Sequence, residues 1–183
     1  MQVRRDKTIY HLTMTAAAAA ALGVVAPWSV PLGPVPISLC TLLLYLTALL
    51  LGPRWAVGAA AVYVLMGAAG LPVFSGFMGG VGHLAGPTGG YIFGYLPLTG
   101  ICALFVKRVS NRWAYLGGMA LGTAVLYAMG TVWFCVQTGT GLGGALVVCV
   151  LPFLPGDLAK MLAALLVGPA LRDRLERSGL LRT

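Results

Sequence analysis

The sequence predicts an all-α membrane protein with six transmembrane helices, and three observations support that prediction. Hydrophobic residues make up 59% of the 183 residues and charged residues only 9%, against about 25% charged residues in an ordinary soluble domain. Apolar segments recur along the chain, and several approach the roughly 20 residues that an α-helix needs to cross a bilayer. The cations fall in clusters between these segments. We expect a single domain over residues 1–183.

The six spans follow one another with a marked break after each. The first begins like a signal peptide, with the basic start MQVRRDK before an apolar run, but AAAAAALGVVAPW continues onward as a spanning helix. The second, ISLCTLLLYLTALLLG, is short, so an upstream extension and a partly re-entrant segment both remain open. The spans lie roughly at residues 8–28, 38–52, 55–71, 88–106, 113–136 and 145–170. Gly, Pro or charge marks the breaks, at residues 27–36, 52–54, 71–87, 107–112 and 137–144.

The positions of the cations predict the orientation of the spans. Eleven of the twelve Lys and Arg residues fall in four segments on one side of a six-span chain, and the other three loops carry no charge. Cytoplasmic loops are enriched in Lys and Arg, so we expect both termini in the cytoplasm. The net charge of +8 is therefore a topology signal rather than a sign of nucleic-acid binding. The eleven are Arg4, Arg5, Lys7, Arg54, Lys107, Arg108, Arg112, Arg172, Arg174, Arg177 and Arg182.

Asp157 and Lys160 are the two charged residues that the sequence places inside a span, in the stretch PFLPGDLAKMLAALLVG. Charges at bilayer depth are costly, and those that occur are usually paired or functional. A spacing of three puts both side chains on one helical face, so one interpretation is a structural ion pair. The other is a site for a small molecule with N–H and C=O groups. Pro152 and Pro155 favour the second, because they should disrupt the helix just before Asp157.

A glycine-rich turn, GGVGHLAGPTGGYIFGY, leads from a long uncharged loop into the fourth span. Thr88 is suited to cap the helix, and Gly89 and Gly90 leave backbone N–H groups approachable, so the turn can attract an anion. The alternative is close helix packing through Gly86, Gly90 and Gly94, and both can hold together. The turn is no nucleotide fingerprint, because no strand is expected before it, and the sequence contains no GxxxxGK[ST] motif.

Two of these motifs together resemble a known family. GPTGGYIFGY, followed about 60 residues later by PFLPGDLAKMLAA in a six-span chain, is similar to the pattern of the BioY family. VPISLCTLLLYLTALLLGPRWA and GLPVF extend the likeness over most of residues 30–165, with Thr41 matching and Cys40 in place of the family's glutamine. BioY proteins are the biotin-specific substrate-capture subunits (S components) of energy-coupling factor (ECF) transporters in prokaryotic cell membranes.

The resemblance implies that the chain captures biotin from outside the cell for ATP-driven import and performs no covalent chemistry. Asp157 would accept hydrogen bonds from the ureido N–H groups, and Lys160 would donate to the ureido carbonyl or steady Asp157. N–H groups of the glycine-rich turn would meet the carboxylate. Loop 71–87, with Phe74, Phe77, Met78 and His83, is interpreted as a lid. The implied substrate-binding residues are Asp157, Lys160, Tyr91, Gly86, Thr88, Gly89, Gly90, Phe74 and His83.

The family also implies partners, namely a transmembrane coupling subunit and two cytosolic ATPases. S components of this kind pack on the coupling subunit through an A-x-x-x-A pattern in the first span, and small residues at this spacing let helices approach closely. Any alanine-rich span contains such pairs, so composition alone is an equal explanation. TAAAAAALG supplies the pattern as Ala16/Ala20 and Ala17/Ala21.

Other classes of protein fit less well. The four cysteines lie inside spans without CxxC spacing, as free apolar residues, and two histidines with one embedded carboxylate are too few for a metal site. No cofactor is expected besides biotin as ligand. An intramembrane serine protease needs an activated serine and a histidine within the bilayer, whereas Ser75 and His83 lie in a loop. An S component or carrier for another small polar solute, and a structural or pore-type membrane protein, remain alternatives.

Overall fold

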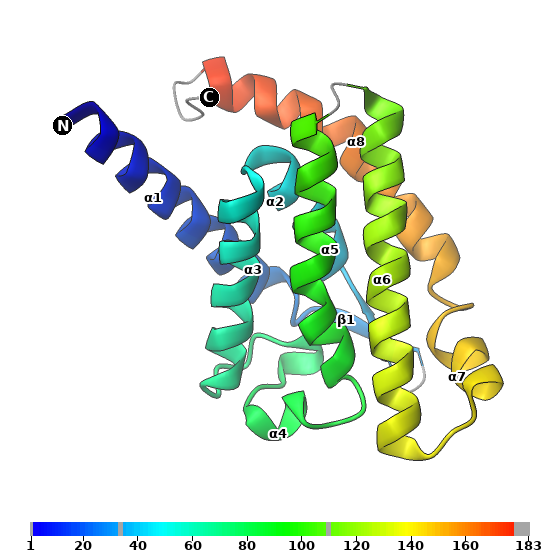
Figure 1. Ribbon diagram of the computed structural model, residues 1–183. Coiled ribbons are helices and arrows are strands. Elements are labelled where there is room, and N and C mark those ends of the chain that lie inside the picture. The colour runs from blue at the N-terminus through cyan, green and yellow to red at the C-terminus, as the bar shows by residue number, and fades with distance from the viewer. Residues whose placement is uncertain (1, 33–34, 109–110, 178–183) are drawn as a thin grey trace.

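The computed structural model describes residues 2–32, 35–108 and 111–177, with the side chains of residues 2–7 and 32 left aside (Figure 1). Helices dominate the fold, and one small hairpin interrupts them. The elements are α1 (Gln2–Val25), β1 (Ser29–Leu32), β2 (Val35–Ser38), α2 (Cys40–Leu50), α3 (Pro53–Ala68), the 3-10 turn η1 (Ser75–Phe77), α4 (Val81–Leu84), α5 (Gly89–Arg108), α6 (Arg112–Thr138), α7 (Leu142–Cys149) and α8 (Leu154–Arg177).

Four of the described helices are long and apolar enough to cross a membrane, namely α1 from Thr8 onward, α5, α6 and α8. The second and third predicted spans form the shorter helices α2, of 11 residues, and α3, of 16 residues. At 1.5 Å per residue, α2 extends only about 16 Å, roughly half of a hydrocarbon core. The sixth predicted span is divided between α7 and α8. The protein is therefore a largely helical membrane protein in which four predicted spans have a helix of full length.

The hairpin β1–β2 corrects the all-α prediction, because segment 27–36 was expected to be only a break. Its antiparallel register pairs Val30 with Ile37 and Pro31 with Pro36. Prolines are tolerated on edge strands, where no N–H is needed on the outer side. Both strands of a two-stranded sheet are edges, so a proline-rich segment can form this one.

Helices α5 and α6 pack closely along each other, and glycines on both helices permit it (Figure 1). A methyl group added at Gly94 would come within 2.7 Å of Leu126 Cδ1, and one at Gly118 within 2.7 Å of Phe105 Cβ. Small residues at such positions let helix backbones approach. The close-packing interpretation of Gly90 and Gly94 is confirmed, since Gly90 lies against the side chain of Trp133.

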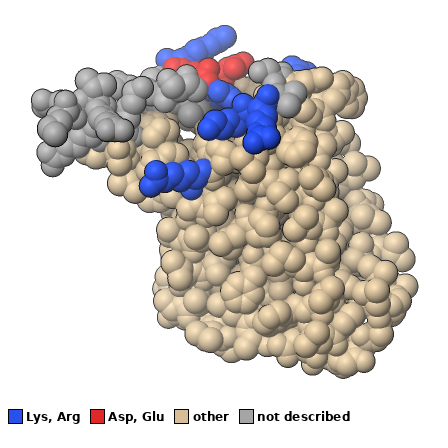
Figure 2. All heavy atoms as spheres, viewed as in Figure 1, with Lys and Arg blue, Asp and Glu red and all other residues tan. Residues whose placement is uncertain are grey.

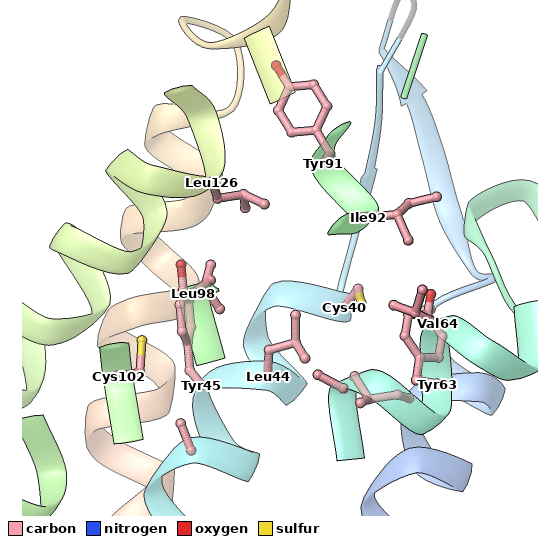
Figure 3. Close-up of a cluster of buried hydrophobic side chains, with 14 of the residues drawn as sticks. Cys40, Leu44, Tyr45, Tyr63, Val64, Tyr91, Ile92, Leu98, Cys102 and Leu126 are labelled. Carbon is pink, nitrogen blue, oxygen red and sulfur yellow. The ribbon is translucent and has the colours of Figure 1, made fainter. Parts of the chain in front are cut away.

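The core is filled by side chains from α2, α3, α5 and α6 that converge on one another (Figure 3). Leu44, Leu98 and the ring of Tyr45 are fully buried. The Tyr45 hydroxyl lies 2.6 Å from Thr123 Oγ1, and because Thr123 donates its own proton to the Met119 carbonyl, Tyr45 is the donor. This contact ties α2 to α6 beneath the cavities described below.

Charged side chains gather at one end of the molecule (Figure 2). Figure 1 places both chain ends and the connection between α5 and α6 at that same end. The rest of the face in view is free of Lys, Arg, Asp and Glu among the described side chains. Of the cations used to predict the orientation, Arg182 and the side chains of Arg4, Arg5 and Lys7 lie outside the described part.

Candidate functional site

Two adjoining cavities lie between strand β2 and helix α5. One is bounded in addition by α2, α6, α7 and α8, and the other by α3 and loop 71–87. The Asp157 cavity has an empty volume of about 410 Å³ and the His83 cavity one of about 350 Å³, both partly open to solvent. Val35, Pro36, Tyr91 and Tyr95 line both of them. The Asp157 cavity is lined in addition by Ile37, Ser38, Thr41, Leu126, Tyr127, Cys149, Phe153, Asp157 and Lys160. The His83 cavity is lined in addition by Tyr63, Phe74, Ser75, His83, Thr88 and Ile92.

The predicted pair Asp157 and Lys160 forms an ion pair in the wall of the first cavity. Lys160 Nζ lies 2.9 Å from Asp157 Oδ1, and the two side chains are only 8% and 11% exposed for Asp157 and Lys160 respectively. Lys160 Nζ also donates to Thr41 Oγ1 at 3.2 Å, and the Thr41 hydroxyl donates to Asp157 Oδ1 at 3.4 Å. The Tyr127 hydroxyl donates to Asp157 Oδ2 at 2.5 Å. Residues from α2, α6 and α8 thus converge on one carboxylate.

The break between α7 and α8 positions Asp157. The predicted effect of Pro152 is confirmed, because α7 ends at Cys149 and α8 begins only at Leu154. The predicted effect of Pro155 is wrong, because Pro155 lies in the first turn of α8, where proline is tolerated. The Asp157 N–H donates to the Phe153 carbonyl at 2.8 Å. Asp157 therefore lies in the first turn of α8, where the helix dipole favours a negative charge.

The ion-pair network leaves part of the hydrogen-bonding capacity of Asp157 and Lys160 unused. A carboxylate offers about four acceptor positions and a lysine ammonium three donors. Among the described residues, three donors reach Asp157 and two acceptors reach Lys160. About one acceptor position on Asp157 Oδ2 and one donor on Lys160 Nζ therefore remain, and both residues line the Asp157 cavity.

Tyr91 lies where the two cavities meet, as a wall of both. Its hydroxyl lies 3.2 Å from Thr131 Oγ1 and donates to the Cys149 carbonyl at 3.4 Å. Its ring packs directly on Gly130 of α6, with no room for a side chain there. The ring is therefore fixed between α5, α6 and α7.

The His83 cavity brings three more of the predicted residues together. Phe74 is 1% exposed, and its ring stacks on His83 with centroids 5.6 Å apart. His83 Nε2 lies 3.5 Å from Thr88 Oγ1. Partial burial lowers the pKa of His83 from its ordinary value because the charged ring loses hydration. This end of the site thus offers neutral hydrogen-bonding groups from Ser75, His83 and Thr88.

Loop 71–87 covers the His83 cavity from one side, and backbone hydrogen bonds are among the contacts that hold it in place. The Gly76 N–H donates to the Pro27 carbonyl at 2.9 Å, and the Gly80 N–H donates to the Gly67 carbonyl at 2.7 Å. Phe77, which has a positive φ of 59°, and Met78 point outward and are about half exposed. Of the residues expected to form the lid, Phe74 and His83 line the cavity.

The structure does not bring Gly86, Gly89 and Gly90 into either cavity. The N–H groups of Gly86 and Gly89 donate to the carbonyls of His83 and Gly86 within the turn, at 3.2 and 3.0 Å. Trp133 Nε1 donates to the Gly86 carbonyl at 2.9 Å. The glycines of the turn thus pack α5 against Trp133. Of the N–H donors that we expected the turn to offer a ligand, those of Gly86 and Gly89 are already used within the turn.

Sequence reasoning missed Tyr127 and did not use Thr41 as a contact of the ion pair. Tyr127 carried a usable signal, because a tyrosine near the middle of a predicted span needs a partner for its hydroxyl. Its partner lies 30 residues away, so the spacing itself is uninformative. Within the described ranges, no three His, Cys, Asp or Glu side chains gather closely enough to hold a metal ion.

The alanine stripe on α1 is exposed at all four positions, Ala16, Ala17, Ala20 and Ala21. Ala17 and Ala21 also line a cavity together with residues of α2 and α8. The opposite face of α1, with Thr15, Ala19 and Leu22, is buried against the bundle. The stripe is therefore available to a partner.

Comparisons with known proteins converge on one family. The model of the BioY family matches residues 1–177. The biotin transporter BioY of Thermotoga maritima is 39% identical over 155 residues, which cover 83% of this chain and 90% of that protein. The probable biotin transporter BioY of Pyrococcus horikoshii is 35% identical over 162 residues, covering 88% and 96%. A crystal structure of the S-component for biotin from an ECF-type ABC transporter superposes with a TM-score of 0.85 at 26% identity, covering 92% and 93%.

Proposed function

The chain belongs to the BioY family, a family of transporter subunits rather than enzymes, and from this premise we propose that it binds biotin as the S component of an ECF importer. Residues 1–177 match the family, and the relatives named as biotin transporters are covered over 90% and 96% of their length. In this proposal residues 1–183 act as one substrate-binding domain.

The observation that carries the proposal is the remaining capacity of the ion pair. One acceptor position on Asp157 and one donor on Lys160 remain unused among the described residues, and both residues line the same cavity. A cyclic urea such as the ureido ring of biotin presents an N–H donor next to a carbonyl acceptor, so it complements this pair directly. The pair is nearly buried, and hydrogen bonds to charged groups contribute about 1.5–3 kcal/mol each.

The adjoining cavities suit the two ends of the same ligand. With the ureido ring at Asp157, the apolar part of biotin would pass Tyr91 and Tyr95, which line both cavities. The carboxylate would then reach the His83 cavity, where His83 and Thr88 supply polar groups. Placing the carboxylate at the other end would bring it against Asp157, a like charge. Phe74 would close the tail end, and the glycines of the turn would act by packing rather than by direct contact.

In the proposed topology six segments cross the membrane, both termini lie in the cytoplasm and the cavities open outward. The gathering of described charges at the end that holds both termini supports this orientation (Figures 1 and 2). The membrane would be the plasma membrane of a prokaryotic cell.

The proposed assembly adds a transmembrane coupling subunit and two cytosolic ATPases. The exposed alanines Ala16, Ala17, Ala20 and Ala21 of α1 are the proposed contact with the coupling subunit, because small side chains permit close helix approach.

Titration of the purified chain with biotin tests the binding proposal directly. We expect saturable binding that is lost in Asp157→Asn and in Lys160→Met. Glu176→Gln is the matched control, because Arg172 and Glu176 form a second ion pair on α8, at 2.9 Å, that is 38% exposed and far along the helix from the cavity. If the native chain binds no biotin, the ligand assignment is wrong and another small solute takes its place. Binding that survives both substitutions would move the site away from the ion pair.

A further inference from the structure

A third cavity, between α6 and α8, meets the Asp157 cavity from the outside of the bundle. It has an empty volume of about 650 Å³, and we call it the lateral cleft. Its outer part is apolar, with Leu154 and Leu158 47% and 55% exposed on α8. Because α6 and α8 are both long and apolar enough to cross a membrane, the cleft opens toward the hydrocarbon of the bilayer. The lining residues are Ala120, Thr123, Ala124, Tyr127, Leu154, Asp157, Leu158 and Met161.

Tyr127 and Asp157 line both the lateral cleft and the Asp157 cavity, and they alone do so among the described residues. The two are joined by the hydrogen bond from the Tyr127 hydroxyl to Asp157 Oδ2. Tyr127 and Asp157, joined by this bond, therefore lie between the Asp157 cavity and the lateral cleft.

The same bond fixes how the carboxylate is turned. The carboxylate turns as a rigid plane about its Cβ–Cγ bond. Lys160 and Thr41 bind Oδ1, and Tyr127 binds Oδ2, so the plane is held at both oxygens. The bond from Tyr127 therefore helps to set the direction in which the remaining acceptor position of Oδ2 points.

We propose that Tyr127 is the positioning residue of the ligand site, with its hydroxyl orienting Asp157 and its ring closing the ligand cavity against the bilayer. The proposal deepens the function proposed above and rests on it for the role of the hydroxyl. The role of the ring is independent of the ligand.

Two substitutions separate the hydroxyl from the ring. Tyr127→Phe removes the hydroxyl and keeps the ring, and we expect its affinity for biotin to fall about tenfold or more, as for a lost hydrogen bond to a charged group. Desthiobiotin keeps the ureido ring and lacks the sulfur, so the affinity for desthiobiotin should fall by the same factor. Tyr45→Phe is the matched control, since it removes a buried hydroxyl that joins α2 to α6 but does not line the cavity.

A Tyr127→Phe protein that binds both ligands like the native protein would overturn the role of the hydroxyl. A loss restricted to biotin would also overturn it, because it would mean that the hydroxyl contacts the sulfur side of the ligand rather than acting through Asp157. If the native chain binds neither ligand, the proposed function fails. The role of the ring is then tested by a second measurement, which needs no ligand.

The second measurement is the reaction of Cys149 with N-ethylmaleimide in lipid bilayers, followed by peptide mass spectrometry. Cys149 lines the Asp157 cavity and is 0% exposed. Tyr127→Ala removes the ring, and we expect its Cys149 to react about tenfold faster than Cys149 of the native protein. A tenfold change corresponds to a free energy of reagent access that is lower by about 1.4 kcal/mol. Tyr127→Phe should react as slowly as the native protein.

Leu158→Ala is the control for this measurement, because it widens the outer part of the cleft and leaves Tyr127 and Asp157 unchanged. Equal rates in Tyr127→Ala and native protein would overturn the role of the ring. Faster reaction in Leu158→Ala as well would assign the barrier to the outer cleft and also overturn it.

Discussion

At the scale of single residues, the chemistry of the site is dominated by two opposite charges that lie out of water. Removing one partner of a buried ion pair leaves the other unpaired and costs about 3–5 kcal/mol, whereas replacing both partners is often neutral. Thr41 and Tyr127 add hydrogen bonds to the pair but carry no charge. The ion pair can therefore be a requirement of the ligand without being a source of stability.

The first prediction separates those two roles. Asp157→Asn and Lys160→Met should each lower the free energy of unfolding by about 3 kcal/mol, or Tm by roughly 6–12 °C for a chain of this size. The double variant Asp157→Asn/Lys160→Met should be more stable than either single variant, because no charge is left unpaired. It should still bind no biotin. Thermal unfolding and ligand titration of the four proteins in detergent give both quantities.

A double variant less stable than both single variants would contradict this account. It would mean that the two positions contribute to stability independently, without the coupling that neighbouring charges produce.

The second prediction concerns His83. Its folded pKa lies below its ordinary value of about 6.5, so the unfolded chain binds the proton first as the pH falls. The free energy of unfolding of the ligand-free protein should therefore decrease as the pH is lowered through about 6.5. His83→Gln should lack this part of the pH dependence. Unfolding at pH 7.5 and 5.5, with and without the substitution, measures the difference.

Biotin affinity should depend on pH in the opposite direction to stability, again because of His83. A carboxylate brought into the His83 cavity favours the protonated ring, so biotin affinity should rise a few-fold from pH 7.5 to 5.5 in the native protein. The affinity of His83→Gln should stay level. An equal rise in both proteins would place the titrating group elsewhere and remove His83 from the carboxylate end.

The sequence alone predicts the ion pair because charged residues inside an apolar span are rare and conspicuous. It does not predict that Thr41 and Tyr127 complete the network, since these contacts join residues 116 and 30 positions apart. Neither residue stands out by type, because threonine and tyrosine also occur in spans for packing. The partners of a buried charge depend on how helices dock, which local patterns do not specify.

At the scale of secondary-structure elements, α6 carries two residues that shape the site, one by its side chain and one by having none. Tyr127 faces Asp157, and Gly130, less than one turn later, receives the ring of Tyr91. The third prediction is that Gly130→Ala displaces this ring, lowers biotin affinity about tenfold and destabilises the fold by about 1–3 kcal/mol. Binding and unfolding measurements on the purified variant test both effects.

Gly117 provides the matched control on the same helix. It is exposed, and a methyl group there would meet nothing within 4 Å. Gly117→Ala should keep full affinity and gain up to about 1 kcal/mol of stability from the better helix propensity of alanine. If Gly130→Ala behaved like Gly117→Ala, Tyr91 would not depend on the glycine beneath it.

Local patterns predicted the long apolar helices best. They predicted least well the hairpin β1–β2 and the division of the sixth span into α7 and α8. Pro31 and Pro36 argue against strands in general, and only the two-edged nature of this hairpin permits them. Conversely, Pro152 was correctly expected to break the helix before Asp157, because a proline acts on its own backbone. The helix break could be predicted because it depends on the backbone of one residue. The hairpin could not, because each strand depends on pairing with the other.

At the scale of the whole molecule, the charged side chains in view gather at one end (Figure 2), and loop 71–87, which lines the His83 cavity, lies at the other (Figure 1). The fourth prediction follows from the proposed orientation. Phe77→Cys, in the exposed part of loop 71–87, should react with a membrane-impermeant maleimide on intact cells. Arg112→Cys, exposed at the start of α6, should react only after the membrane is opened.

The native cysteines make this measurement clean, since Cys40, Cys102 and Cys149 are buried and Cys135 is partly buried. Reaction of Arg112→Cys but not of Phe77→Cys on intact cells would mean that the protein has the opposite orientation in the membrane. Reaction of both on intact cells would contradict a six-span arrangement with the two sites on opposite sides.

The enclosed carboxylate of Asp157 has a consequence for how affinity and stability are related. In the ligand-free protein it has already exchanged water for Lys160, Thr41 and Tyr127, so the free energy of dehydrating this charge is spent during folding rather than during capture. A binding site preorganised in this way gains affinity at the expense of the empty fold. Selection for tight binding and selection for a robust empty protein therefore act in opposite directions on the same four side chains.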